Sequence, residues 1–375
     1  MLNELATKLK INNSSSSKRN NIAMPFQLSS NDHYNQRIVI ALGDPAGIGM
    51  EVTLRALAMH SNLGNHWSPL LVGCRRSLEE CHSRLQRLGV KTIAEIAALE
   101  MLDLPLEKPV VIGKPSAQSG AASFLWLTCA VELVLGGQGC ALVTAPIAKH
   151  AWHAAGYHYS GQTERLSELT DGAQASMLFT ALSPNSGWRL NTLLATTHVP
   201  LADVPALITP TLVHAKLDVL LAFCRRFRDR PHLAVAGLNP HAGEQGYLGR
   251  AEVDWLNDCL DQWRRRHPEI RLDGPVPPDS CWLAAGRAWH AAGSIYAEDA
   301  PNGLLAMYHD QGLIPMKLLA FDAAVNTTLG LPFLRTSPDH GTGCDIAGQG
   351  LASPNSMAAA MMTAWELTAP VLHQK

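Results

Sequence analysis

Short apolar runs alternate with longer amphipathic stretches from residue 37 to the end of the chain. The runs at 37–42 and 69–72 predict strands, and the stretches at 49–59 and 77–88 predict helices. The alternation continues, with further strands expected at 140–144, 190–196, 232–237 and 303–307 and further helices at 121–135, 210–226, 250–266 and 356–371. Strands that alternate with helices are typical of an α/β fold, in which helices cover a largely parallel sheet.

The first 36 residues differ in composition from the rest of the chain. They are rich in serine and asparagine, with four consecutive serines at 14–17, and they show no periodic apolar pattern. Such a segment has too little apolar surface to offset the entropy of ordering it. We therefore expect residues 1–36 to form a disordered N-terminal tail, with the fold beginning at residue 37.

Composition narrows the class of protein. The chain has 375 residues, of which 47% are hydrophobic and 17% charged, enough to bury the core of one large or two ordinary domains. A net charge of −2 without a basic face argues against nucleic acid binding. The apolar stretch 124–145 is interrupted by Glu132 and by glycines, so no uncharged run reaches the roughly 18 residues of a membrane span. Eight scattered cysteines without a CxxC pair are typical of reduced thiols in a cytoplasmic protein.

Three predicted strands end at or near a histidine, namely His198, His241 and His309. Ligands in α/β sheets bind beyond the carboxyl ends of the strands, so these imidazoles are expected near one another. A single strand-end histidine among 16 is more often structural, and the argument rests on three of them at the same topological position. Three imidazoles with an open coordination position suit a catalytic divalent metal. We expect zinc, with magnesium or cobalt as alternatives.

Three further segments have the chemistry of ligand binding. The glycine-rich turn at 43–49 is either an anion site at a helix N-terminus or a plain structural turn, and it matches neither the Rossmann nor the Walker pattern. Lys317, Asn326 and Arg335 follow at equal spacing, the latter two in an expected loop at 326–338, and lysine and arginine are the usual anchors for phosphate. The loop at 339–348 is either a surface loop or a wrapping for a flat polar ligand such as adenosine.

Several motifs together resemble one family in order along the chain. They are GDPAGIG (43–49), VTAPIAK (143–149), GQTE (161–164), TTHVPL (196–201), GLNPHAGE (237–244), GPVPPD (274–279), YHDQGL (308–313) and NTTLGLPFLRTSPDHGTGCDIAG (326–348). This set resembles the 4-hydroxythreonine-4-phosphate dehydrogenase family of pyridoxal phosphate biosynthesis, from residue 37 to the C-terminus.

The resemblance implies a fold related to the isocitrate and isopropylmalate dehydrogenases. Two α/β/α domains would flank an active-site cleft. The first, on the nucleotide side, would comprise residues 37–144 and 311–375. The second, residues 145–310, would carry the metal, substrate and dimer contacts. The resemblance also implies a homodimer with the active site near the interface.

The resemblance further assigns roles to residues. His198, His241 and His309 match the metal ligands. Substrate-binding positions correspond to Gln162, Thr163, Lys317, Asn326 and Arg335, and Lys317 and Asp279 are the candidate catalytic groups. His340, Gly341 and Asp345 lie in the segment expected to bind NAD or NADP. The implied reaction is the metal-dependent oxidation of 4-phosphohydroxy-L-threonine to 2-amino-3-oxo-4-phosphooxybutanoate, which decarboxylates to 3-amino-2-oxopropyl phosphate.

One departure from the family pattern keeps alternatives open. Gln162 stands where the pattern has histidine, and a glutamine forms hydrogen bonds but carries no charge. The same chemistry on threonate 4-phosphate, erythronate 4-phosphate or a dihydrodiol is therefore an alternative. From other classes, a metal-dependent hydrolase or aldolase and a non-catalytic phosphate-binding protein also remain. The sequence leaves the choice between NAD and NADP open.

Overall fold

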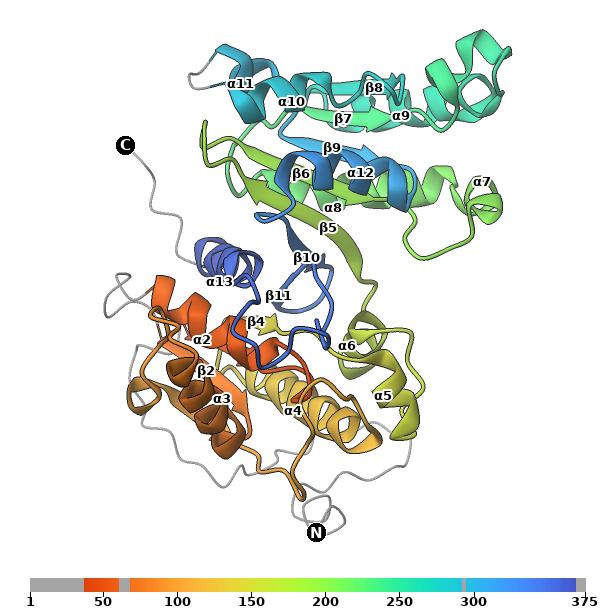
Figure 1. The fold of residues 1–375 in the computed structure, drawn as a ribbon. Helices are drawn as coiled ribbons and strands as arrows, with labels where there is room; N and C mark the ends of the chain where they lie inside the picture. Colours follow the sequence, from red (N-terminus) through yellow and green to blue (C-terminus); the bar gives the residue numbers. More distant parts are fainter. Residues whose placement is uncertain (1–36, 61–67, 292–294, 369–375) are drawn as a thin grey trace.

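The computed structural model describes residues 37–60, 68–291 and 295–368, and within them the strands form one mixed sheet (Figure 1). Its strand order is β3-β2-β1-β4-β11-β10-β5-β6-β9-β7-β8. The strands are β1 (Arg37–Ala41), β2 (Ser68–Gly73), β3 (Glu100–Asp103), β4 (Ala141–Thr144), β5 (Ser176–Leu182), β6 (Arg189–Leu194), β7 (Leu233–Ala236), β8 (Leu272–Val276), β9 (Gly303–Ala306), β10 (Val325–Leu329) and β11 (Leu334–Pro338). The predicted tail at 1–36 lies outside the described residues.

Helices cover both halves of the sheet, the first comprising β3, β2, β1 and β4 and the second comprising β5, β6, β9, β7 and β8. Those of the first half are α2 (Gly49–Met59), α3 (Arg75–Arg87), α4 (Ala117–Leu135) and α13 (Asn355–Thr368). Those of the second half are α8 (Pro210–Cys224), α9 (Asn257–Arg266), α10 (Leu283–His290) and α12 (His309–Ala320). On β6, Leu193 packs into the core formed with α8 and α9, whereas Leu190 and Leu194 pack into the core formed with α10 and α12. Alternate residues of a strand face opposite sides, so the second half has three layers.

Most predicted elements are present, which confirms the α/β class. Helix α2 spans the predicted residues, and strand β1 is buried along its whole length. Helix α4 begins four residues earlier than predicted, because Ser116 and Ser119 form a reciprocal capping box at its N-terminus. Helix α4 is the one helix in the described part of the chain that is long and apolar enough for a membrane span, and 61% of that apolar window is buried in the protein.

The prediction of a loop at 326–338 is wrong. These residues form β10 and β11, an antiparallel pair in which Thr328 lies opposite Arg335. Because β5 also pairs antiparallel with both β10 and β6, the sheet is parallel only on its two flanks. Most buried positions of this hairpin are polar, namely Thr327, Thr328, Arg335, Thr336 and Ser337, and only Val325 is a buried aliphatic residue, so the strands lack a clear apolar signature.

The sheet runs without a break from one half of the molecule to the other. Helices α5 (Lys149–Ala154) and α6 (Gln162–Leu169) contact α4 of the first half, while α12 packs on β6 and β9 of the second. The division into two domains after residue 144 and before residue 311 stays a prediction.

Candidate active site

Arg335 of β11 is a buried cation whose hydrogen-bond partners are all neutral. Its side chain is 4% exposed. Nε and Nη2 donate to Thr144 Oγ1, Nη1 donates to Thr328 Oγ1, and Nη2 also donates to Gln162 Oε1 at 3.2 Å. Burial lowers the pKa of the guanidinium to about 10, so it remains charged at neutral pH. A buried charge without a counter-ion is costly, and this one is therefore suited to receive an anionic group of a ligand.

Gln162 links Arg335 to the backbone beyond β4. Its Nε2 donates to the carbonyl of Ala145 at 3.1 Å while its Oε1 accepts from Arg335. Gln162 is also the first residue of α6, whose N-cap, Gly161, provides no side-chain cap. Thr163 follows it in the first turn of that helix, where backbone N–H groups favour anions. The structure thus brings two of the predicted substrate residues, Arg335 and Gln162, into direct contact.

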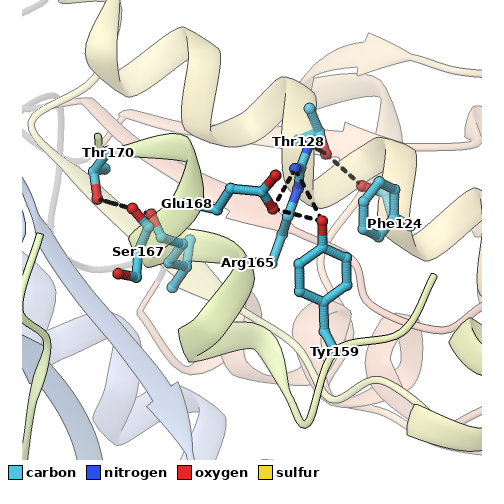
Figure 2. Close-up of polar contacts among 8 residues, drawn as sticks. Phe124, Thr128, Tyr159, Arg165, Ser167, Glu168 and Thr170 are labelled. Carbon is cyan, nitrogen blue, oxygen red and sulfur yellow. Dashed lines mark hydrogen bonds and ion pairs between the residues drawn. The ribbon is translucent and has the colours of Figure 1, made fainter. Parts of the chain in front are cut away.

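Helix α6 is held in place by an aromatic and ionic cluster (Figure 2). The Arg165 guanidinium lies 4.6 Å from the centre of the Phe124 ring and donates to Glu168 at 3.0 Å and to Thr128 of α4 at 3.3 Å. The Tyr159 hydroxyl donates to the same Glu168 carboxylate at 2.5 Å. This hydrogen bond is the main cause that lowers the pKa of Glu168. The cluster fixes α6 on α4, and with it the position of Gln162.

His198 and His309 meet where two neighbouring parallel strands end. Leu194 of β6 lies opposite Ala306 of β9, and the histidines follow these strands. Their ring centroids are 5.5 Å apart. Burial, followed by the nearby His309 and Lys149, lowers the pKa of His198, which favours the neutral form that binds metals. His309 is the first residue of α12, and its Nδ1 lies 2.7 Å from Asp310 Oδ1.

His241 lies apart from this pair within one chain. It follows β7 in a stretch where residues 241–245 all have positive φ. Its side chain is 62% exposed, and its Nδ1 lies 3.0 Å from Glu244 Oε2, which raises the pKa of the imidazole. The nearby Asp279 adds a smaller effect in the same direction. Among the described residues, no group of three or more His, Cys, Asp or Glu side chains surrounds a common metal position. The two adjacent imidazoles fit a divalent ion and need at least one more donor.

The turn at 43–49 and the loop at 339–348 pack directly on each other. The Ile48 amide donates to the carbonyl of Thr342 at 2.9 Å, and the Asp44 amide donates to the carbonyl of Pro146. Asp44 Oδ1 accepts from the Ala46 amide at 2.8 Å, so a carboxylate of the protein already occupies the concave side of the turn. These contacts favour the structural interpretation of the turn over an anion site.

A cavity of about 250 Å³ lies beside these two segments. His340 and Gly341, two of the predicted cofactor residues, line it together with Ile48. The third, Asp345, is exposed and does not line the cavity. Asp339 also lines it and forms an ion pair with the predicted substrate residue Lys317, with 3.1 Å between Nζ and Oδ2.

Other predicted residues lie around these groups. Asn326 of β10 is half-buried, and its Oδ1 has no hydrogen-bond partner among the described residues. Asp279 is exposed after β8. The sequence reasoning missed Thr144, Thr328, Asp339 and the cluster around Arg165. A polar residue within an apolar strand was the available signal for Thr144.

Comparison with known proteins identifies the family. The family model described as "Pyridoxal phosphate biosynthetic protein PdxA" matches residues 65–364, more than half of the chain. The chain belongs to the PdxA family. A 4-hydroxythreonine-4-phosphate dehydrogenase from Synechococcus sp. (strain RCC307) is 59% identical to this PdxA-family chain over 331 residues, which cover 88% of the chain and 99% of the relative. A protein of the same name from Thermosynechococcus vestitus is 49% identical over 334 residues, which cover 88% of this chain and 96% of that relative.

The fold of this PdxA-family member agrees with a solved structure. The crystal structure of 4-hydroxythreonine-4-phosphate dehydrogenase from Klebsiella pneumoniae superposes with a TM-score of 0.73 at 32% identity, and it covers 89% of this chain and 98% of its own. These relatives carry the name of an oxidoreductase. The resemblance drawn from the motifs is thereby confirmed.

Proposed function

We propose that this chain is a 4-hydroxythreonine-4-phosphate dehydrogenase that requires a divalent metal and NAD or NADP. It would oxidise 4-phosphohydroxy-L-threonine to 2-amino-3-oxo-4-phosphooxybutanoate, which loses CO2 to give 3-amino-2-oxopropyl phosphate, a step toward pyridoxal phosphate. The observation that carries the proposal is the buried, unneutralised guanidinium of Arg335. The phosphate of the proposed substrate would supply an anion to this cation.

Each part of the substrate then has a place. Arg335 and the first turn of α6 at Thr163 would bind the phosphate, with Asn326 beside them on β10. Gln162 would orient the Arg335 guanidinium and leave its positive charge uncompensated. Lys317 would lie at the other end of the substrate, held by Asp339. Fixing both ends of a small molecule orients the hydroxyl that reacts.

His198 and His309 would hold the metal, with His241 as the third ligand. The exposure of His241 supports either a rearrangement of residues 240–246 or donation from a second copy of the chain. A homodimer with the site near its interface, as the resemblance implies, provides the second route. Bound metal would polarise the substrate hydroxyl, and bound nicotinamide would accept the hydride.

The remaining step of the reaction is removal of the hydroxyl proton. Lys317 and Asp279 are the candidate bases. Lys317 forms an ion pair with Asp339, which would hold it at its place beside the substrate. Asp279 is exposed and lies close enough to His241 to influence its pKa. Asp279 would therefore act on the side of the third metal ligand.

A cytoplasmic location is part of the same proposal. It is supported by all eight cysteines being free thiols, five of them buried. Oxidising compartments favour disulfides in place of such thiols.

The direct test is formation of NADH or NADPH from 4-phosphohydroxy-L-threonine, with added zinc and with a chelator. Metal-dependent turnover supports the proposal. Parallel assays use unphosphorylated 4-hydroxythreonine, threonate 4-phosphate, erythronate 4-phosphate and a dihydrodiol. Preference for another phosphorylated acid would change the assigned substrate and leave the role of Arg335 as proposed. Preference for the unphosphorylated compound or the dihydrodiol would overturn that role.

A further inference from the structure

The cavity beside the loop at 339–348 has an apolar side and an acidic side. Ile48 and Ile346 line it from the turn and the loop, and Phe321 and Asp322 line it from the end of α12. Asp339 adds a second carboxylate. No lysine or arginine of the described residues is part of the lining, and the nearby Lys317 is paired with Asp339.

Phe321 provides an aromatic face at the rim of this cavity. Its side chain is 67% exposed although it follows directly on a helix that packs against the sheet. Phe321 lines the same cavity as the aliphatic Ile48 and Ile346, and we call this apolar side of the cavity the base slot. Aromatic side chains stack on purine bases, so the slot is suited to an adenine.

Asp322 is an acceptor without a partner. It is exposed, and the described part of the chain offers it no hydrogen bond or ion pair. A free carboxylate next to a base slot accepts hydrogen bonds from the vicinal hydroxyls of a ribose. The same carboxylate repels a phosphate at the 2′ position, and like charges placed together suppress the wrong partner.

We propose that Phe321 and Asp322 bind the adenosine of the cofactor and make the site select NAD⁺ over NADP⁺. This inference rests on the proposed dehydrogenase function and assigns two residues that the family motifs do not include. Phe321 stacks on the adenine, and Asp322 accepts from the ribose hydroxyls. Asp339, already neutralised by Lys317, contributes less to the repulsion of a 2′-phosphate.

Calorimetric titration of the full-length protein with NAD⁺, NADP⁺, AMP and adenosine 2′-monophosphate measures this selectivity without turnover. We expect NAD⁺ to bind at least about tenfold more tightly than NADP⁺, and Asp322→Arg to reduce or reverse that ratio by about tenfold or more. Phe321→Ala should weaken AMP and NAD⁺ by about tenfold without changing the ratio. Asp258→Arg on α9 and Leu318→Ala on α12 are matched exposed controls and should change neither value.

The outcomes separate this inference from the function on which it rests. If the wild-type protein binds no nicotinamide nucleotide, the dehydrogenase function itself fails. If it binds NAD⁺ and NADP⁺ equally, or if folded Asp322→Arg retains the wild-type ratio, the selectivity inference fails and the function stands. If Phe321→Ala binds AMP as the wild type does, the adenine lies elsewhere. Thermal melting of each variant confirms that it is folded.

Discussion

The Nη2 atom of Arg335 lies 3.2 Å from the side-chain oxygen of Gln162, so the hydrogen-bond partner that α6 supplies to this buried cation is an uncharged amide. The other partners of the guanidinium are threonine hydroxyls. The positive charge therefore stays available to a ligand, which a carboxylate at position 162 would prevent.

Gln162→Glu should neutralise this charge. We expect KM for the phosphorylated substrate to rise about tenfold or more, because the guanidinium would already be paired. Inorganic phosphate should weaken as an inhibitor in parallel, while the melting temperature stays the same or rises. Steady-state kinetics and thermal melting measure these effects, and Gln86→Glu on the exposed face of α3 is the control. A variant with unchanged KM would show that Arg335 does not bind the phosphate.

Arg335→Met should separate stability from activity. The methionine removes a buried charge and keeps much of the side-chain volume, so we expect unfolding free energy to change by no more than about 1 kcal/mol. Activity with the phosphorylated substrate should fall by about 100-fold or more, because a charge-assisted contact is lost. Urea unfolding and kcat/KM provide the two readouts. Strong destabilisation with intact residual kcat/KM would indicate a structural cation.

The metal site can be tested one histidine at a time. His198→Ala and His309→Ala should each abolish tight zinc binding, since either change leaves a single imidazole of the adjacent pair. His241→Ala should do the same if the third ligand is supplied as proposed. Metal content after dialysis measures the loss, with His290→Ala at the exposed end of α10 as the control. Full zinc retention in His241→Ala would remove that residue from the ligand set.

Gly47→Ala probes the contact between the turn at 43–49 and the loop at 339–348. A Cβ at this position would lie 2.8 Å from the carbonyl oxygen and 3.1 Å from the Cβ of Thr342, so the two segments must move apart. We expect a loss of about 1–3 kcal/mol in stability and weaker nucleotide binding. Gly286→Ala in α10 meets no atom within 4 Å and should be neutral or stabilising. Equal nucleotide affinity in Gly47→Ala and the wild type would show that the turn does not contribute to nucleotide binding.

The periodic part of the fold could be predicted from the sequence, and so could the meeting of His198 and His309. Both follow from apolar strands whose ends share one edge of a sheet. The hairpin at 325–338 could not be predicted because several of its buried residues, such as Thr327, Thr328 and Arg335, are polar. Arg335 finds its hydrogen-bond partners in Thr144 of β4 and in Thr328 across the hairpin, and no local pattern indicates either. The position of His241 could not be predicted either, because it depends on five residues with positive φ that no local pattern indicates.

The central place of β10 and β11 has a consequence for how the protein is made. These strands come from residues 325–338, yet they lie between β4 and β5 and join the two halves of the sheet. Until the ribosome has released them, β4 and β5 each present an unpaired edge, and such edges invite pairing with other chains. Arg335 belongs to the same hairpin, so it is also absent until these strands are made. A nascent or truncated chain therefore exposes these unpaired strand edges and lacks the Arg335 guanidinium for the same period, and both conditions end when one hairpin docks.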